Sequence, residues 1–410
     1  MATRRLYYDD SYLQNFRARV LACLPAEPVR SASGTQPAWE VLLDRTALYP
    51  TSGGQPNDLG RLGDAQVLDV LDAGDDVAHI IDRELALGEI DGCIDWPRRF
   101  DHMQQHTGQH LISAMFHERF GLPTVSFHLG GDLCTIDLRG PEPSPDVLRG
   151  AQRFANAIVF GDRPVTVRYG TADQLAQQGV RKEVERQGLL RAIEIESADL
   201  QPCGGTHVKS TGQIGLLLIR RCTKIRQDWR VEFVCGGRAE RFATADYQLL
   251  RTIADKLSCA PEEAMAAIEK TSAERDAHFK NLRAALQQLA EARAKLLVAS
   301  ATPAPNGIRL ISVLLREENL DLLLPLANEL AKSESTIALL IHEPTGNLVF
   351  AQSPTGANGG AGKDLPSILK QLLAAFPGKG GGTRDFTRAK LADPSHSASA
   401  LALASKLATS

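Results

Sequence analysis

The chain has 410 residues, of which 43% are hydrophobic and 23% charged, and its formal net charge at pH 7 is −3. This length predicts two or three domains, each large enough for its own core. The small negative charge argues against a general nucleic-acid-binding protein. The chain has no run of about 18 apolar residues, so we predict no membrane span. The start of the chain also lacks the apolar core of a signal peptide.

The seven cysteines are scattered along the chain, and no CxxC motif occurs. An odd number of dispersed cysteines does not indicate a disulfide framework, and it favours the reducing environment of the cytoplasm. We therefore predict a cytoplasmic protein with free thiols.

Charge is distributed unevenly. Residues 1–95 carry 8 basic and 16 acidic side chains, a net charge of −8, which leaves +5 for the remainder. Residues 220–241, here called the basic strip, hold seven basic side chains against three acidic ones. A phosphate backbone could dock on this strip, but an ordinary solvated surface explains the charges equally well. Its basic residues are Arg220, Arg221, Lys224, Arg226, Arg230, Arg238 and Arg241.

Short apolar segments separated by Gly, Asp and Pro predict a β-rich domain over residues 1–95. The clearest strands are 39–43, 65–72 and 77–81, and a small β-barrel or curled sheet is the expected form. The segment ALYPTSGGQPNDLG (47–60) predicts a loop within this domain, because its Gly-Gly pair and two prolines break regular structure.

Residues 96–240 predict an α+β domain. Apolar residues within 100–121 recur with helical periodicity, and Gly121 stands where a helix C-cap belongs. The pair Gly130-Gly131 indicates a hairpin within 127–138. The remaining pattern predicts helices at 146–160 and 172–187, and strands at 164–169, 191–195, 214–220 and 230–235.

Residues 241–300 predict a long helical stalk. From Met265 to Leu296, residues spaced alternately by three and four form a coiled-coil seam that Ser272, Arg275 and Arg293 interrupt. An antiparallel helical hairpin or a homodimer through this stalk is expected, and a helix packed on its own domain is the alternative. Residues 301–410 then predict a small α/β domain, so the whole chain is expected to be a multidomain α+β protein.

Two short motifs carry the residue types of a metal site. HTGQH supplies His106 and His110, and CGGTH supplies Cys203 and His207, with 92 residues between the pairs. Each pair has spacing i, i+4, which puts two side chains on one face of a helix. Imidazole and thiolate are the ligands that zinc prefers, and four of them complete a tetrahedron. We therefore predict one zinc site formed by both motifs, although either motif alone is weak evidence.

The residues around these motifs offer polar groups for a substrate. In the loop at 47–60, Thr51 and Ser52 supply hydroxyls, Gly53 and Gly54 supply backbone amides, and Gln55 supplies a side-chain amide. Such a loop can line a small polar pocket, but an ordinary β-turn is the simpler interpretation. Near the histidines, the polar residues Gln104, Gln105, Thr107 and Gln109 could support the metal ligands or contact a substrate.

Near the C-terminus, PGKGGGTRDF (377–386) is rich in Gly and basic, but it lacks the Lys-Ser/Thr ending of a phosphate-binding P-loop. Its glycines would let a phosphate approach the backbone closely, and a simple turn is an equally good explanation.

ALYPTSGGQP, HTGQH, CGGTH and GKGGG occur in this order, and together they resemble the AlaX family in its long form. These are free-standing relatives of the editing and C-terminal domains of alanyl-tRNA synthetase. The resemblance covers roughly residues 1–390, and the combination of HTGQH with CGGTH is its most specific part. It implies an N-terminal barrel, a synthetase-like editing domain, a helical stalk and a small C-terminal domain of the type associated with DHH phosphoesterases. Phosphoesterase activity and an aminoacylation domain are not expected.

The resemblance also implies an activity. Members of the family hydrolyse the ester of tRNA(Ala) wrongly charged with serine, and often with glycine. It implies that zinc is the cofactor, held by His106, His110, Cys203 and His207. Mischarged tRNA(Ala) is the expected partner, and no membrane partner is expected.

Ester hydrolysis assigns roles to particular residues. Zinc can polarise the ester carbonyl or activate a bound water. No Asp or Glu lies within the motifs, so His106, His110 or the 2′-hydroxyl of the tRNA remains open as the base. A pocket that bonds the serine hydroxyl would reject alanine, and we expect Thr51, Ser52, Gln109 and Thr124 to form it. The acceptor stem is expected to contact Arg220, Arg221, Lys224 and Arg226.

Two other functions fit the same residues. Four protein ligands normally make a closed, structural zinc site, so a non-catalytic tRNA-binding module stapled by zinc is one alternative. A zinc hydrolase acting on small esters or amides is the other. If the protein is an enzyme, one of the four ligands must yield, or the metal must act without binding the attacking water.

Overall fold

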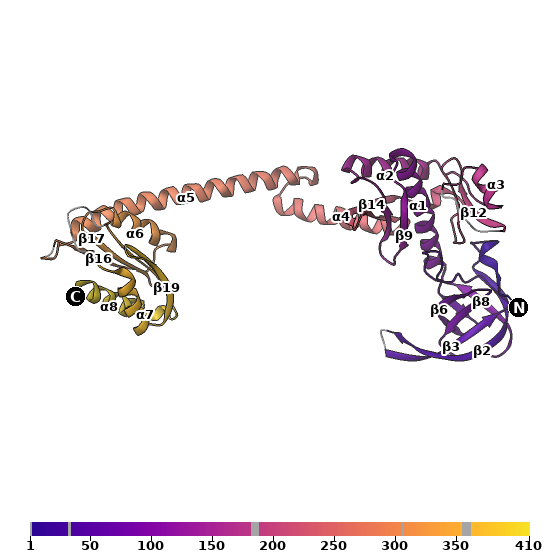
Figure 1. Cartoon of the computed structure of the whole chain (residues 1–410), viewed down its shortest axis with the longest axis horizontal. Coiled ribbons are helices and arrows are strands. Elements are labelled where there is room, and N and C mark those ends of the chain that lie inside the picture. Colours follow the sequence, from indigo (N-terminus) through magenta and orange to yellow (C-terminus); the bar gives the residue numbers. More distant parts are fainter. Residues whose placement is uncertain (1, 32–33, 182–187, 306, 355–361) are drawn as a thin grey trace. The chain divides into compact units, whose positions relative to one another are not determined.

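The computed structural model describes residues 2–31, 34–181, 188–305, 307–354 and 362–410, and it has the predicted mixture of helices and strands (Figure 1). The chain divides into two compact units, residues 1–252 and 253–410. Among the described residues, no helix is both long enough and apolar enough to cross a membrane.

Six strands near the N-terminus pair in the order β2-β3-β7-β6-β5-β8, and β8 also pairs with β2, so the row closes on itself. Alternate side chains point inward and form one apolar core that includes Val41, Leu43 and Val70. The strands are β2 (Asn15–Ser31), β3 (Gly34–Leu43), β5 (Gly60–Leu62), β6 (Ala65–Ala73), β7 (Asp76–Ile81) and β8 (Gly88–Ile94). A separate pair, β1 (Arg4–Arg5) with β4 (Arg45–Thr46), flanks a short 3₁₀ turn at Leu6–Tyr8.

Helix α1 (Trp96–Phe120) carries the HTGQH motif. It begins four residues before the predicted helix, because Asp95 caps it by accepting from the backbone N–H of Arg98 at 3.3 Å. It ends as predicted at Gly121, which has φ +65° and therefore terminates the helix in the left-handed conformation. The middle of α1 is buried along its whole circumference, so both histidines lie inside the protein.

A four-stranded antiparallel sheet, ordered β14-β15-β10-β9, packs against α1 and α2 (Pro145–Phe160). It contains the predicted hairpin between β9 (Thr124–Leu129) and β10 (Cys134–Leu138), together with β14 (Leu217–Ile225) and β15 (Asp228–Cys235). The short 3₁₀ turn at Thr211–Ile214 leads into β14. The core between sheet and helices is apolar, with Phe116, Ile136 and Phe233 fully buried.

A second sheet of three strands contains β11 (Val165–Gly170), β12 (Leu190–Ile195) and β13 (Asp199–Pro202). The predicted helix at 172–187 is too long, since α3 (Ala172–Gln177) ends after six residues. Gly179 follows with φ +83°, a conformation that a helix cannot contain. Residues 182–187 of that prediction lie outside the described part of the chain.

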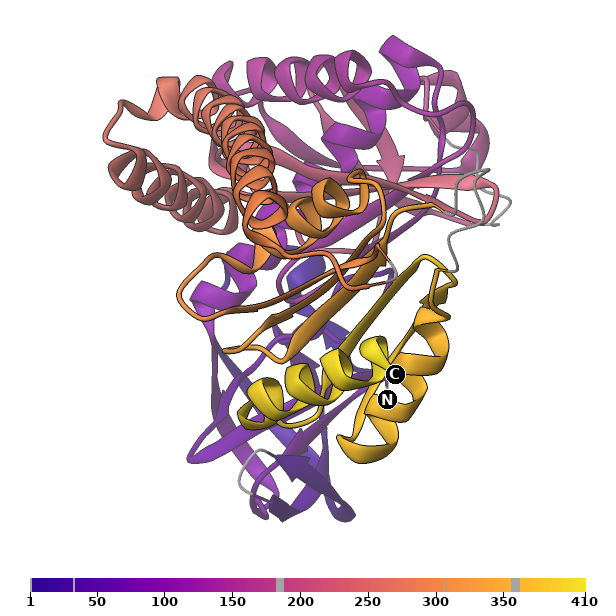
Figure 2. The same cartoon turned by 90° about the vertical axis from the view of Figure 1, so that its left-hand side faces the viewer.

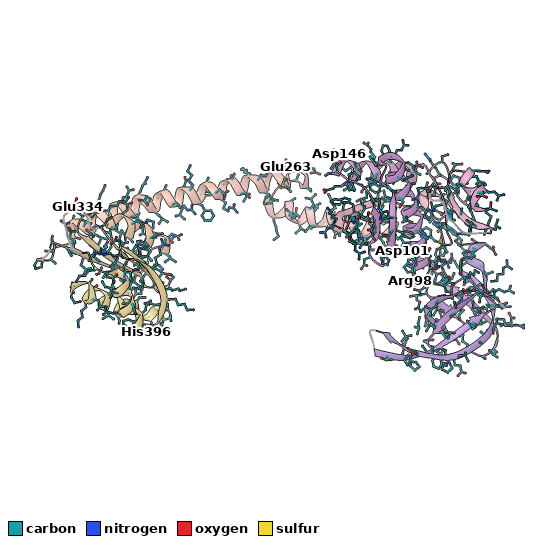
Figure 3. All side chains as sticks on the ribbon, viewed as in Figure 1. Arg98, Asp101, Asp146, Glu263, Glu334 and His396 are labelled. Carbon is teal, nitrogen blue, oxygen red and sulfur yellow. The ribbon has the colours of Figure 1, made fainter. Side chains whose placement is uncertain are left out.

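The helical stalk predicted over 241–300 consists of two helices, α4 (Gly236–Leu257) and α5 (Ala264–Ser300). Ser258 adopts φ +53° directly after α4, and Pro261 opens the 3₁₀ turn Pro261–Glu263. Both features end helical hydrogen bonding, because a left-handed residue reverses the chain and proline has no N–H to donate. Glu263 lies directly before the start of α5 (Figure 3).

The second unit contains a five-stranded sheet in the order β16-β17-β18-β20-β19. Helices α5 and α6 (Leu323–Ala331) cover one face, and α7 (Leu365–Ala375) and α8 (Ser397–Thr409) cover the other (Figure 2). The strands are β16 (Arg309–Leu315), β17 (Thr336–His342), β18 (Asn347–Gln352), β19 (Gly378–Thr383) and β20 (Phe386–Leu391), and short 3₁₀ turns lie at Leu320–Leu322 and Pro394–His396.

The GKGGG segment is the edge strand β19, not a turn. Cβ atoms added at Gly380 and Gly382 would lie 2.2 and 2.1 Å from the neighbouring strand, so this edge requires glycine.

Candidate metal centre

Two segments far apart in the sequence meet at one point in the first unit. His106 and His110 lie one turn apart on α1, while Cys203 and His207 lie in the loop after β13. One ligand atom from each of the four residues lies within 4.8 Å of the others. Cys203 Sγ is 3.4 Å from His106 Nε2 and 3.3 Å from His207 Nε2. The motifs therefore form one cluster that could hold a metal ion, as their residue types predict.

An oxygen atom from another side chain holds the Nδ1 atom of each imidazole. The pairs are His106 Nδ1 with Gln55 Oε1 at 2.8 Å, His110 Nδ1 with Asp199 Oδ2 at 3.1 Å, and His207 Nδ1 with Thr107 Oγ1 at 3.1 Å. These contacts fix the plane of each ring and leave Nε2 available to a metal ion.

The partners of the imidazoles also decide which nitrogen carries hydrogen. The Thr107 hydroxyl donates to a backbone carbonyl one turn earlier at 2.8 Å, so it can only accept from His207. Gln55 donates through Nε2 to Thr206 at 2.9 Å and accepts through Oε1. A carboxylate such as Asp199 only accepts when it is ionised. Each Nδ1 is thus a donor, and Nε2 is the nitrogen of each ring that can bind a metal once it carries no proton.

Burial and charge together set the ionisation of the cluster. Burial opposes ionisation of the Cys203 thiol, but His106 and His207 outweigh it and hold the pKa of that thiol well below its ordinary value. Burial, assisted by the charge of His106, lowers the pKa of His207 to about 3. Burial also acts to lower the pKa of His110, but hydrogen bonds to Asp199 and Cys203 raise it to about 9. The cluster therefore favours a thiolate, the form in which cysteine binds metals.

The CGGTH loop can follow this path because it contains glycine. A Cβ atom at Gly205 would lie 2.2 Å from His106 Cε1, closer than two carbon atoms can approach. The Gly205 N–H donates to Cys203 Sγ at 3.3 Å. Arg191 donates from Nη1 to the carbonyls of Cys203 at 2.7 Å and Gly205 at 3.0 Å, and its guanidinium lies 5.5 Å from the ring centroid of Tyr8. These contacts hold the loop around the cluster.

The loop at 47–60 brings Gln55 to the metal cluster through a tight turn. Ser52 and Gln55 exchange backbone hydrogen bonds, while Gly53 has φ +56° and Gly54 φ +79°. Two successive positive φ angles define a type I′ turn. The turn packs against β9, because Leu129 N donates to Gly54 O at 3.3 Å. The predicted β-turn is present, and its last residue extends into the cluster.

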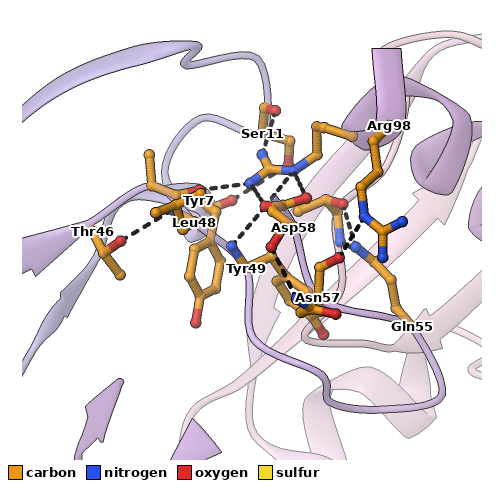
Figure 4. Close-up of polar contacts among 12 residues, drawn as sticks. Tyr7, Ser11, Thr46, Leu48, Tyr49, Gln55, Asn57, Asp58 and Arg98 are labelled. Atoms are coloured by element: carbon orange, nitrogen blue, oxygen red, sulfur yellow. Dashed lines mark hydrogen bonds and ion pairs between the residues drawn. The ribbon is translucent and has the colours of Figure 1, made fainter. Parts of the chain in front are cut away.

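A buried ion pair ties this loop to α1 (Figure 4). Arg99 and Asp58 are both fully buried, and Arg99 Nε lies 3.0 and 2.9 Å from the two carboxylate oxygens. The guanidinium also donates to Ser11 O at 2.9 Å and Ala47 O at 2.6 Å, and Asp58 accepts from Tyr49 N at 2.6 Å. Since every polar group of the pair has partners, it fixes the loop without leaving an unpaired buried charge.

Other predicted substrate residues lie at two places. Gln109 is buried on α1 and donates to Ser113 Oγ at 2.9 Å, and Thr124 on β9 donates to the same oxygen at 2.9 Å. Thr51 is exposed, and its hydroxyl accepts from Asn57 N at 3.1 Å. Ser52 is half-buried and hydrogen-bonds Asp72, which helps to lower the pKa of that carboxyl after the larger effect of the Arg5 hydrogen bond.

The basic strip is divided between paired and unpaired charges. Arg220 pairs with Asp246, Arg230 with Asp137, and the buried Arg238 with Asp101. In contrast, Arg221, Lys224 and Arg226 on or beside β14 are exposed, and none of them makes a salt bridge within the described residues. Three of the four predicted tRNA contacts are therefore free to meet phosphate.

Three residues of the site were not found from the sequence. Asp199, Arg181 and Arg191 hold His110 and the CGGTH loop, although none belongs to a motif. Asp199 lies four residues before Cys203 in the chain. That spacing is the only feature of the sequence that connects Asp199 with the site, because its contact with α1 depends on the packing of β13.

Comparison with known proteins places the chain among editing proteins. Residues 190–230 match the domain described as "Threonyl and Alanyl tRNA synthetase second additional domain". The alanyl-tRNA editing protein Aarsd1 of Mus musculus is 30% identical over 403 residues, covering 96% of this chain and 95% of that protein. The alanyl-tRNA editing protein AlaX-L of Pyrococcus horikoshii is 30% identical over 410 residues, covering 94% of each. The chain belongs to the AlaX family of alanyl-tRNA editing proteins, in its long form.

The AlaX family assignment agrees with a more distant comparison. The alanine–tRNA ligase of Pyrococcus abyssi is 29% identical over 422 residues, which cover 97% of this chain but 43% of the ligase. In this AlaX chain, the matched synthetase domain includes Cys203 and His207, whereas His106 and His110 precede it.

Proposed function

We propose that this AlaX protein is a trans-editing deacylase that hydrolyses Ser-tRNA(Ala), and that Gly-tRNA(Ala) is a second substrate to test. The editing proteins to which it is similar support a role on alanyl-tRNA. One observation carries the hydrolytic assignment: four ligand atoms of zinc-binding type converge within 4.8 Å, and a hydrogen bond at Nδ1 of each histidine leaves its Nε2 for a metal ion. Such a centre suits the hydrolysis of an ester.

The domain boundaries belong to the same proposal. Residues 1–95 would form the N-terminal barrel domain and 96–240 the editing domain. Residues 241–300 would form the stalk and 301–410 the C-terminal domain. In support, the strands of 1–95 have a core of their own, and both motifs of the metal cluster lie within 96–240.

Zinc is the metal that this donor set fits best, since thiolate and imidazole are ligands that zinc prefers and four of them complete a tetrahedron. His106, His110, Cys203 and His207 would hold it, and the bound ion would polarise the ester or activate water. The surrounding side chains have a separate task. Gln55, Thr107 and Asp199 keep the three rings in place, so that the site needs little reorganisation when substrate arrives.

Discrimination between serine and alanine is assigned to polar groups on the histidine face of α1. Gln109 and Ser113 share that face with His106 and His110 by their spacing, and Thr124 joins them through Ser113. A serine hydroxyl bound among these groups would complete their hydrogen bonds, whereas alanine would leave them unpaired. Thr51, Ser52, Gly53 and Gly54 in the turn beside Gln55 are the second candidates for contact with the aminoacyl group.

We assign the binding of the tRNA to exposed, positively charged side chains of the basic strip. Arg221, Lys224 and Arg226 offer exposed cations to the acceptor stem, while Arg220 would need to leave Asp246 to do so. Contacts of this kind recognise the phosphate backbone and the shape of an RNA helix. Action in the cytoplasm fits the free cysteines of the described residues.

A deacylation assay tests the proposal. Purified protein is incubated with Ser-, Gly- and Ala-tRNA(Ala), with and without a chelator, next to a Cys203→Ala variant. We expect release of serine, retention of alanine, and loss of activity in the chelated protein and in the variant. Full turnover by a Cys203→Ala protein that contains no zinc would refute the role of the metal.

One observation favours a second candidate function. Four protein ligands can satisfy zinc completely, which suits a structural site in a tRNA-binding module. That module would bind tRNA with strong salt dependence and would not release any amino acid. The same assay distinguishes the two functions.

A further inference from the structure

The three imidazoles of the cluster differ in what holds them. His106 meets the neutral amide of Gln55, and His207 meets the neutral hydroxyl of Thr107. His110 alone meets a carboxylate, that of Asp199. Hydrogen bonds to a charged acceptor are stronger than neutral ones, and they raise the basicity of the nitrogen on the other side of the ring. His110 is therefore the most firmly held of the three rings.

Asp199 is itself held in place by Arg181. The side chain of Asp199 is 1% exposed, and that of Arg181 is 13% exposed. Arg181 Nε donates to Oδ1 at 2.8 Å, while Oδ2 faces His110 Nδ1 at 3.1 Å. One oxygen therefore serves mainly the arginine and the other the histidine. The backbone of Arg181 is fixed as well, because its N–H donates to Leu200 O at 3.0 Å in β13.

This chain of contacts differs from an ordinary surface ion pair. In the same three-stranded sheet, Arg168 pairs with Glu194, but those side chains are 56% and 32% exposed. Burying a carboxylate is costly unless its oxygens have strong partners. Arg181 offsets that cost at Asp199, and the second oxygen is left directed at a predicted metal ligand. An isolated structural ion pair would not need the contact with His110.

We propose that Asp199 is a positioning residue for metal binding, and that Arg181 keeps its carboxylate directed at His110. The inference rests on the proposed function, because it assumes that the cluster binds zinc. Through this contact, Asp199 selects the ring orientation and the tautomer in which His110 Nε2 faces the metal. Arg181 and Asp199 touch neither the metal nor the substrate, so their effect on hydrolysis is indirect.

Zinc affinity measures this role without reference to activity. The full-length protein, stripped of metal, is titrated with zinc against a chelator of known affinity. Asp199→Asn keeps the shape of the side chain but removes its charge, and we expect zinc to bind about 10- to 100-fold more weakly. Arg181→Gln is expected to have a smaller effect in the same direction, and Arg181→Lys should restore part of it. Arg168→Gln, which breaks the exposed pair of the same sheet, should leave the affinity unchanged.

Cobalt substitution and a stability measurement separate positioning from folding. If Asp199 positions His110, the visible spectrum of the cobalt-loaded protein should change in Asp199→Asn, while any fall in the melting temperature of the metal-free protein should be shared by Arg181→Gln, which breaks the same ion pair. Equal zinc affinity in wild type, Asp199→Asn and Arg181→Gln would refute the inference alone. A wild-type protein that binds no zinc would refute the metal in the proposed function and this inference with it. Should Asp199→Asn not fold, the Arg181 variants decide the result.

Discussion

At the scale of single residues, the two glycines of CGGTH have different roles. A Cβ atom at Gly205 would collide with His106, but one at Gly204 would lie 3.5 Å from the Tyr8 hydroxyl, an ordinary contact. Gly205 therefore makes room for a predicted metal ligand, and Gly204 does not. This difference within one motif gives a matched pair of variants.

We expect Gly205→Ala to displace the His106 ring and to weaken zinc binding by about tenfold or more. Gly204→Ala should bind zinc as the wild type does, because its methyl group meets no clash. Competition with a chelator measures both affinities. If the two variants lose affinity equally, the effect comes from general stiffening of the loop and not from the collision with His106.

The convergence of the four predicted metal ligands was predictable from residue type and spacing, whereas their supporting residues were not. His106, His110, Cys203 and His207 belong to two short motifs that suit one metal. Asp199 and Arg181 support His110 through contacts that only the folded chain brings together, and no local sequence pattern indicates them. Gln55 was placed near the substrate from its loop, but its hydrogen bond to His106 crosses 51 positions of the sequence.

At the scale of elements, the hairpin of β14 and β15 presents the part of the basic strip that remains available. Arg221, Lys224 and Arg226 are exposed there without salt bridges in the described residues, while three other arginines of the strip are paired. The charge of a strip alone did not separate these two groups. The separation depends on which acidic side chains the fold brings close, and these are Asp246 on α4, Asp137 on β10 and Asp101 on α1.

Replacing Arg221, Lys224 and Arg226 together by alanine should weaken tRNA binding and reduce its salt dependence. Each lost phosphate contact lowers the slope of log K against log salt by about one. Arg17→Ala, at a cation paired with Asp91 in the acidic N-terminal region, should leave the slope unchanged. Binding titrations at several salt concentrations measure these slopes, and an unchanged slope in the triple variant would remove this hairpin from the tRNA interface.

Long elements with clear end signals were predicted best. The helix of HTGQH had periodicity, a capping glycine and enough length, and α1 follows it closely. The helix at 172–187 was overestimated, because polar periodicity continues past the point where Gly179 turns the chain. Strand β19 was missed because glycine has low strand propensity, and only its pairing with β20 makes it a strand.

At the scale of the whole molecule, the two units have separate apolar cores. The residues of the seam predicted on α5 lie in two different environments. Leu286 packs in the core of the second unit, and Arg293 pairs with Glu318. The alternative of a helix packed on its own domain therefore holds for that part of α5. Other seam residues are exposed, and dimerisation through them stays a prediction; they are Met265, Ile268, Phe279, Leu282, Leu289 and Leu296.

Because the two units have separate cores, we expect more than one unfolding transition. Acid should lower the stability of the first unit through protonation of His79. His79 is fully buried, donates from Nδ1 to Val41 O at 3.2 Å, and accepts from the Thr46 hydroxyl at 2.9 Å. Burial lowers the pKa of His79 to about 4. As the pH falls, the imidazole of His79 takes up a proton in the unfolded chain before it does so in the folded chain. The contribution of neutral, buried His79 to the free energy of unfolding is therefore complete above about pH 6.5 and is lost as the pH falls towards 4. The total is roughly 3 kcal/mol.

Calorimetry between pH 7 and pH 4.5 checks this expectation. One transition should move to lower temperature with falling pH, and His79→Gln should reduce that movement. The exposed His117 serves as the control, since His117→Gln should leave the pH dependence as in wild type. An equal pH dependence in His79→Gln and wild type would exclude His79 as the source.

The hydrogen bond from His106 to Gln55 joins a predicted metal ligand to the turn of an N-terminal loop, in a different segment of the first unit. Two processes that share one contact influence each other to the same extent. Filling the metal site should therefore tighten the attachment of the N-terminal strands to α1, and loosening of those strands should release the metal. Metal occupancy would then report whether the parts of the first unit are correctly assembled.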